Sequence, residues 1–152
     1  MIYKGKVLQQ VNKSVLMPYS REQIYALVND IHSYPEFLPW CAAAQIKELN
    51  ETCLTAEIII AKGPIRVTFT TKNELLPPEK IKMHLHSGPF RELEGFWQFE
   101  ALSEKACRVT LQIQFEFENK LLCMSVSAVF QQILSSLVDA FLARARVLYG
   151  KQ

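Results

Sequence analysis

The sequence lacks the cysteine spacing that marks a disulfide framework or a zinc site. Its four cysteines (Cys41, Cys53, Cys107 and Cys123) form no CxxC pair and no cluster with histidine. We therefore expect buried, reduced thiols in a cytoplasmic protein. A signal peptide is not expected either, because polar residues interrupt the chain from Gln9 onward, before any apolar run is established.

Strong charge of one sign is also missing. The net charge is +2, and 21% of the 152 residues are charged against 49% that are hydrophobic. This balance does not by itself indicate a nucleic-acid or membrane partner. A chain of this length buries roughly two-thirds of its unfolded surface, so residues 1–152 are expected to fold as one domain without disulfides or metal.

What the sequence does have is a rigid aromatic segment, Tyr34-Pro35-Glu36-Phe37-Leu38-Pro39-Trp40. Each proline fixes its own φ and pushes the residue before it, Tyr34 or Leu38, toward extended geometry. The segment is therefore predicted to be irregular, neither a regular helix nor a central strand. A segment this apolar packs either as the lid of a core or as the rim of a pocket.

Upstream of this segment, the pattern predicts one strand and two short helices. Residues 7–17 alternate loosely, with valines on one face, as in an edge strand. Ser20 and Gln23 form a capping box that predicts a helix over 21–29. Asp30 is expected to cap a second, shorter helical turn that ends at the prolines.

Downstream, the apolar period changes to two and predicts six antiparallel strands. Turn-forming residues separate the strands at intervals too short for crossover connections. The last strand is the clearest, since every second residue from Cys107 to Phe117 is apolar and the residues between them are polar. That alternation is typical of a sheet with one face in water. The predicted ranges are 43–50, 53–62, 65–76, 80–87, 91–101 and 106–118.

A long helix is predicted from Asn119 to about Tyr149, with Gly150 as its stop. One wide face of this helix is apolar, which would also suit a membrane span. Asp139 falls near its middle, and an aspartate at the centre of a bilayer costs about 2.5–3.5 kcal/mol. A helix packed along the sheet explains both features, so no transmembrane segment is expected.

Together these elements predict an α+β fold. A seven-stranded antiparallel sheet would curl around the long C-terminal helix, with the two short helices beside it. A curled sheet with a helix across its mouth can enclose an apolar cavity instead of a solid core.

Several short motifs accompany this order of elements. Pro18-Tyr19-Ser20 precedes the first helix, and Val28-Asn29-Asp30-Ile31 and Tyr34 to Pro39 follow it. The layout closely resembles the RatA (ribosome association toxin) family, which belongs with the coenzyme Q-binding, START-like helix-grip proteins, formerly described as polyketide or oligoketide cyclases. The resemblance covers roughly residues 12–149. Its other matching stretches are Phe69-Thr70-Thr71-Lys72-Asn73, Gly88-Pro89-Phe90 and Phe115-Glu116-Phe117-Glu118-Asn119-Lys120-Leu121.

The resemblance implies two activities. One is that of a toxin which binds the large ribosomal subunit and blocks its association with the small one, and so inhibits translation. The other is that of a carrier or chaperone for ubiquinone or another isoprenoid lipid, in support of respiration. The resemblance supplies no catalytic residues, so a binding protein is expected and a polyketide cyclase-type enzyme is the least favoured alternative.

Alternation along the strands selects candidate residues for the cavity. None of the predicted inward strand residues is titratable, whereas a cyclase needs a positioned acid or base. An apolar chamber suits a lipid tail, although the same residues would also fill an ordinary core. Tyr34, Phe37 and Trp40 are assigned to the rim. The ligand-binding candidates are Tyr34, Phe37, Phe69, Met83, Leu93, Trp97, Phe115, Phe117, Phe130, Leu134 and Phe141.

Basic side chains on two neighbouring strands indicate a second surface. Residues 66, 68, 70 and 72 share one strand face, and residues 80, 82, 84 and 86 share one face of the next. If the two strands pair, these residues form a basic, hydroxyl-bearing outer patch that suits the phosphates of ribosomal RNA. A solvated sheet face is the alternative, and DNA is not an expected partner. The RNA-binding candidates are Arg66, Lys72, Lys80 and Lys82.

Two other groups are weaker candidates. His84 and His86 could both face a metal ion, but they share the polar side of their strand and no carboxylate joins them at ligand spacing, so no metal site is expected. Glu57 lies on a strand that is apolar on both faces and is a candidate buried acid. A half-exposed position at the sheet rim is the preferred interpretation.

Overall fold

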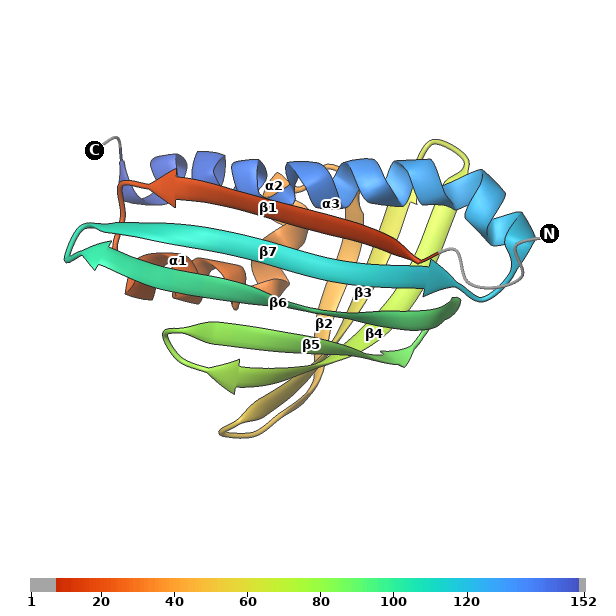
Figure 1. The fold of residues 1–152 in the computed structure, drawn as a ribbon, viewed down its shortest axis with the longest axis horizontal. Helices are drawn as coiled ribbons and strands as arrows, with labels where there is room; N and C mark the ends of the chain where they lie inside the picture. The colour runs from red at the N-terminus through yellow and green to blue at the C-terminus, as the bar shows by residue number, and fades with distance from the viewer. Residues whose placement is uncertain (1–7, 151–152) are drawn as a thin grey trace.

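The computed structural model describes residues 8–150, in which a seven-stranded antiparallel sheet curls around one long helix (Figure 1). The strand order is β1-β7-β6-β5-β4-β3-β2, so the first strand pairs with the last and lies at the edge of the sheet, as predicted. Residue 7, the predicted start of that strand, lies outside the described residues. The strands are β1 (Gln9–Met17), β2 (Cys41–Leu49), β3 (Cys53–Lys62), β4 (Ile65–Leu76), β5 (Lys80–Ser87), β6 (Phe90–Ser103) and β7 (Ala106–Phe117).

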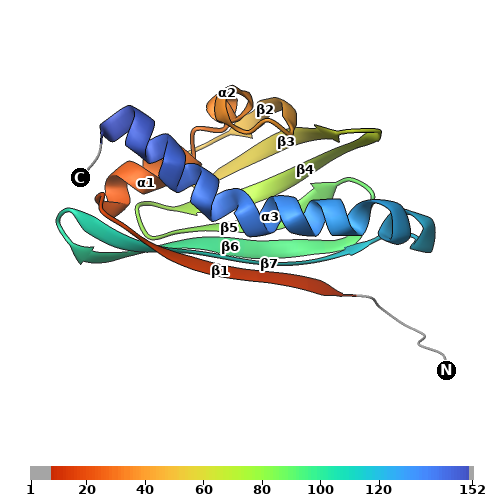
Figure 2. The same ribbon diagram turned by 90° about the horizontal axis from the view of Figure 1, so that it is seen from above.

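The long helix α3 (Lys120–Tyr149) lies along the sheet and contacts β1 and β7, while α2 (Tyr34–Phe37) lies over β2 (Figure 2). Asn119 caps the first turn of α3, since the Asn119 side chain accepts a hydrogen bond of 2.8 Å from the Leu122 amide. By length and composition α3 could also cross a membrane. In this structure its buried face, which includes Phe130 and Phe141, packs in the core instead.

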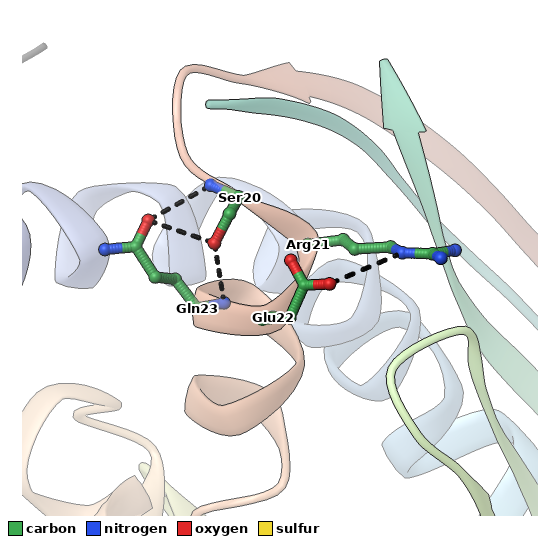
Figure 3. Close-up of polar contacts among 4 residues, drawn as sticks. All are labelled: Ser20, Arg21, Glu22 and Gln23. Atoms are coloured by element: carbon green, nitrogen blue, oxygen red, sulfur yellow. Dashed lines mark hydrogen bonds and ion pairs between the residues drawn. The ribbon is translucent and has the colours of Figure 1, made fainter. Parts of the chain in front are cut away.

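The capping box at the first helix is present as predicted (Figure 3). The Ser20 hydroxyl accepts a hydrogen bond of 3.1 Å from the Gln23 amide, and the Gln23 side-chain oxygen accepts one of 3.0 Å from the Ser20 amide. Two backbone donors that have no partner within the helix are thereby satisfied. The helix that follows, α1, runs over Arg21–Val28.

The prediction of an irregular segment from Tyr34 to Trp40 is wrong for its first half. Tyr34 is helical (φ −52°, ψ −45°), and the short 3-10 helix η1 (Ile31–Ser33) leads directly into α2. Pro35 is tolerated because it stands in the first turn of α2, where a backbone N–H has no intrahelical partner to lose. Leu38, before the second proline, is extended as predicted.

Asp30 stands at the N-cap of η1, but it does not cap the turn as expected. Its side chain makes no hydrogen bond to the backbone of η1. The Asp30 carboxylate instead accepts a hydrogen bond of 2.7 Å from the Ser33 hydroxyl. The Tyr34 hydroxyl donates a hydrogen bond to the Val28 carbonyl oxygen and so ties the start of α2 back to α1.

Candidate functional site: an apolar cavity and a basic outer face

Between the concave face of the sheet and α3 lies a cavity of about 90 Å³. Strands β3 to β7 and α3 supply its walls, and Tyr34 and Trp40 reach it from the α2 side. Pockets that hold drug-sized ligands measure roughly 300–1,000 Å³. Most of the interior is therefore a filled core, and a lipid could enter only if side chains moved.

The structure separates the predicted cavity residues into two groups. Phe37, Phe115, Phe117 and Phe141 do not line the cavity; the last three are buried in the core, where Phe115 packs edge-on against Phe130 with ring centroids 4.8 Å apart. The residues that do line it are Tyr34, Phe69, Met83, Leu93, Trp97, Phe130 and Leu134.

The predicted rim is anchored to α3 at two points. The Phe37 and Phe141 rings pack edge-on with centroids 5.3 Å apart, and the Arg144 guanidinium lies 5.0 Å from the centroid of Phe37. Arg144 also pairs with Glu36 at 3.0 Å. Burial raises the pKa of Tyr34 far above its ordinary value, so its hydroxyl stays protonated as a donor. These contacts hold α2 over one end of the cavity.

The sequence interpretation missed three polar residues that line this cavity: Asn29, Thr71 and Asn73. The side-chain oxygens of Asn29 and Asn73 are buried and have no hydrogen-bond partner among the described residues. Leaving such a group unsatisfied costs about 1–3 kcal/mol. The signal for two of them was present, because Thr71 and Asn73 continue the inward alternation that Val67 and Phe69 begin on β4.

On the convex face, the register of the strands defines a basic cluster. Lys82 lies directly opposite Phe96 of β6, and the Lys80 ammonium is 4.7 Å from the centre of the Phe96 ring. On the other side of β6, Gln112 of β7 lies opposite Phe96, and Asn12 of the edge strand β1 lies opposite Gln112. We call Lys80, Lys82 and Phe96 the outer basic cluster.

The predicted RNA-binding residues are not all brought together. Lys72 lies opposite His84, beside the outer basic cluster. Arg66 pairs with Ala61 of β3 instead, beyond the end of β5. Lys82 lies opposite Glu74 of β4, and Arg66 is eight positions from Glu74 along that strand. At about 3.3 Å per residue, this separation is roughly 26 Å.

Thr70 was expected in the exposed outer patch but is buried. It is only 7% exposed, at a register shift between Thr70 and Thr71 where β4 and β5 lose regular pairing.

The weaker candidates lie away from the cavity. Glu57 is half-buried on the outer side of β3 and pairs with Lys47 at 3.8 Å. His84 is exposed, with its Nδ1 atom 3.9 Å from the Glu94 carboxylate. Within residues 8–150, no group of three or more His, Cys, Asp or Glu side chains is placed to hold a metal ion.

Comparison with known proteins agrees with this architecture. The family model for "Polyketide cyclase / dehydrase and lipid transport" proteins matches residues 17–142. The Ribosome association toxin RatA of Pseudomonas aeruginosa is 46% identical over 140 residues, which cover 92% of this chain and 97% of that protein. The chain belongs to the RatA family. RatA of Escherichia coli is 43% identical over 144 residues, covering 95% of this chain and 91% of that protein.

More distant similarity extends in two directions. The mitochondrial coenzyme Q-binding protein COQ10 homolog B of Xenopus laevis is 26% identical over 94% of this chain, which spans 60% of that protein. Among solved structures, the Zhui aromatase/cyclase of a Streptomyces species superposes with a TM-score of 0.78 at 16% identity, over 92% of this chain and 96% of that one. A START superfamily protein from Mycobacterium smegmatis superposes with a TM-score of 0.76 at 20% identity, over 91% of this chain and 98% of that one. These two neighbours show that this chain has the START-like helix-grip fold.

Proposed function

We propose that this protein binds the large ribosomal subunit and hinders its association with the small subunit, acting as a toxin-type inhibitor of translation. Two relatives named ribosome association toxins, 43% and 46% identical over nearly their whole length, support this function. The structural observation that carries the proposal is the outer basic cluster on the convex face.

The chemistry of this cluster suits RNA. Lysine ammonium groups contact phosphates, and an aromatic ring on a sheet face offers a surface on which a base can stack. Phe96 is half-buried, with the Lys80 ammonium over its ring and Lys82 opposite it on β5. Side-chain amides at Gln112 and Asn12 continue the same row across the sheet and can hydrogen-bond to base edges or ribose.

The test is a double charge reversal, Lys80→Glu with Lys82→Glu. Both side chains lie on the outer face, Lys82 exposed and Lys80 half-buried over Phe96, so the fold is expected to survive while co-sedimentation with large subunits weakens. Overproduction of the wild-type protein should raise free subunits in sucrose gradients, and the variant should not. Lys62→Glu with Lys105→Glu makes the same change in net charge at exposed sites elsewhere and serves as the control. Unchanged co-sedimentation of the Lys80/Lys82 variant would refute this assignment.

A second candidate function is the binding of an apolar lipid such as ubiquinone in the cavity under α3. The relative named as a coenzyme Q-binding protein and the apolar lining of the cavity favour it. The two functions are compatible, because the cavity and the outer basic cluster lie on opposite faces of the sheet. Organic extraction of the purified protein should release a quinone; repeated extraction without one counts against this candidate.

Binding accounts for the cavity better than catalysis does. Among residues 8–150, no Asp, Glu, His, Lys or Arg side chain lines it. The titratable group that does line it, the Tyr34 hydroxyl, donates its proton to a backbone carbonyl oxygen and has a raised pKa. General acid–base catalysis requires a group that exchanges its proton near the working pH, which this arrangement does not provide.

A further inference from the structure

The cavity is lined by polar side chains that an ordinary core would not leave unpartnered. Asn73 lies on the concave face of β4, is 6% exposed, and lines the cavity with an amide oxygen that has no partner among residues 8–150. Asn29, at the C-cap of α1, lines the same cavity with a second unpartnered amide oxygen. Buried polar groups are nearly always hydrogen-bonded in native proteins. Two exceptions facing one cavity indicate a place where a ligand supplies the missing bonds.

The rest of the lining restricts the charge of that ligand. Apart from Asn29, Thr71 and Asn73, the lining is aliphatic and aromatic, and among residues 8–150 no acidic or basic side chain lines the cavity. A carboxylate or phosphate would therefore lose its hydration without meeting a counter-charge, which is strongly unfavourable. A neutral group that forms hydrogen bonds meets no such penalty.

We propose that Asn73, together with Asn29 and Thr71, anchors the neutral hydrogen-bonding end of an apolar ligand. The ligand class is a phenol, hydroquinone or alcohol attached to an apolar body, and not a fatty acid or a phospholipid. This inference rests on the lipid-binding candidate above and specifies its substrate class. The unpartnered atoms of Asn73 and Asn29 are amide oxygens, which accept hydrogen bonds, so the polar end of the ligand must carry a donor such as a hydroxyl group.

The size of the cavity fixes how such a ligand enters. About 90 Å³ admits only the end of a molecule in the form seen here. Met83 lines the cavity and is only partly buried, and an unbranched methionine side chain can swing aside more easily than its branched or aromatic neighbours. The ligand's apolar body would therefore displace Met83 or the α2 rim while its polar end reaches Asn73.

Three probes that differ only in their polar end test the proposal: decylbenzene, para-decylphenol and para-decylbenzoate. Binding to the full chain can be followed through the fluorescence of Trp40 and Trp97, both of which line the cavity. The wild type should bind the phenol about tenfold more tightly than decylbenzene, the gain expected of one well-made neutral hydrogen bond. It should show no preference for the charged benzoate.

Asn73→Leu should remove the preference for the phenol and, without any probe, raise the melting temperature, since it deletes an unsatisfied polar group. Asn73→Ala gives the same comparison if the leucine variant does not fold. Gln45→Leu, which removes an exposed amide on β2, is the matched control and should keep the preference.

Three results would overturn the inference: a preference for the phenol that survives at Asn73→Leu, equal wild-type affinity for all three probes, or tightest binding of the benzoate. If the wild type binds none of the probes, the lipid-binding candidate fails with it. The sucrose-gradient assay reports the ribosomal function separately.

Discussion

At the scale of single residues, the buried thiols make the free energy of unfolding decrease at alkaline pH. Burial raises the pKa of Cys41 and of Cys107 to about 11, from an ordinary value near 9. Between about pH 9 and pH 11 the unfolded chain releases these protons and the folded chain keeps them. The free energy of unfolding therefore falls as pH rises through this window.

We predict that the urea midpoint drops between pH 8.5 and 10.5, a range chosen to fall roughly within this window. The double variant Cys41→Ala with Cys107→Ala should show a shallower drop, since the buried tyrosines still contribute. Equal drops in the two proteins would mean that the thiols do not carry the effect.

Gly95 allows β6 and β7 to approach each other closely. A Cβ atom at this position would press on the Gln112 carbonyl oxygen and would lie 2.6 Å from the Cα atom of Ile113. Both are backbone atoms that cannot turn aside, so Gly95→Ala forces the strands apart.

We predict that Gly95→Ala lowers the free energy of unfolding by about 3 kcal/mol, at the upper end for overpacked sites. Chemical denaturation measures this loss. Gly63→Asn is the control, because Gly63 has open space around its Cα atom and its φ of +60° suits asparagine. A loss below about 1 kcal/mol for Gly95→Ala would contradict the close approach.

At the scale of elements, the first helix depends on its capping box. Ser20→Ala removes the acceptor for the Gln23 amide and should destabilise the protein by about 1 kcal/mol. Ser20→Asp, which retains a capping acceptor, should remain close to the wild type. Thermal and urea unfolding of the three proteins give the comparison, and equal loss in both variants would point to a different role for Ser20.

The regular elements were largely predictable because each leaves a periodic mark on the sequence. The ranges 53–62, 65–76 and 80–87 match β3, β4 and β5 residue for residue, because the turn-forming pairs Gly63-Pro64, Pro77-Pro78 and Gly88-Pro89 mark where these strands end. The α2 turn was not predicted, because Pro35 biases Tyr34 toward extended geometry and only contacts that appear in the folded chain, such as the Tyr34 hydrogen bond to Val28, overcome that bias.

The candidate site was less predictable, for two physical reasons. Strand parity shows which face a residue occupies but not its register, so the distance between Arg66 and Lys82 could not be known before β4 and β5 were seen to pair. The volume of the cavity depends on how side chains interlock, and no pattern of residue types encodes that. The inward position of Asn73, in contrast, could have been predicted from the alternation of inward and outward residues along β4.

At the scale of the whole molecule, charge is divided between adjoining parts of one sheet. Residues 62–91 carry six basic and two acidic side chains, whereas residues 92–118 carry two basic and six acidic ones. An anionic partner is therefore drawn to the β4–β5 part of the outer face and repelled by Glu94 and Glu100 of β6, which lie on either side of Phe96.

This division leads to a prediction about salt. Neutralising two phosphate contacts with Lys80→Gln and Lys82→Gln should reduce the slope of log affinity against log salt by about 1.5, at roughly 0.7–0.9 per contact. Binding to isolated large subunits at several salt concentrations measures the slope. A slope identical to that of the wild type would place the contact surface elsewhere.

The pairing of β1 with β7 also sets an order of assembly during synthesis. Gln9 is joined to Phe115, more than one hundred residues later, so the first strand made must wait for the last before it has a neighbour. Lys80, Lys82 and Phe96, in contrast, all belong to the consecutive strands β5 and β6. During synthesis, the residues of the outer basic cluster are therefore present before α3 is made. The cavity lined by Asn73 can form only after α3 has been translated and has packed against the sheet.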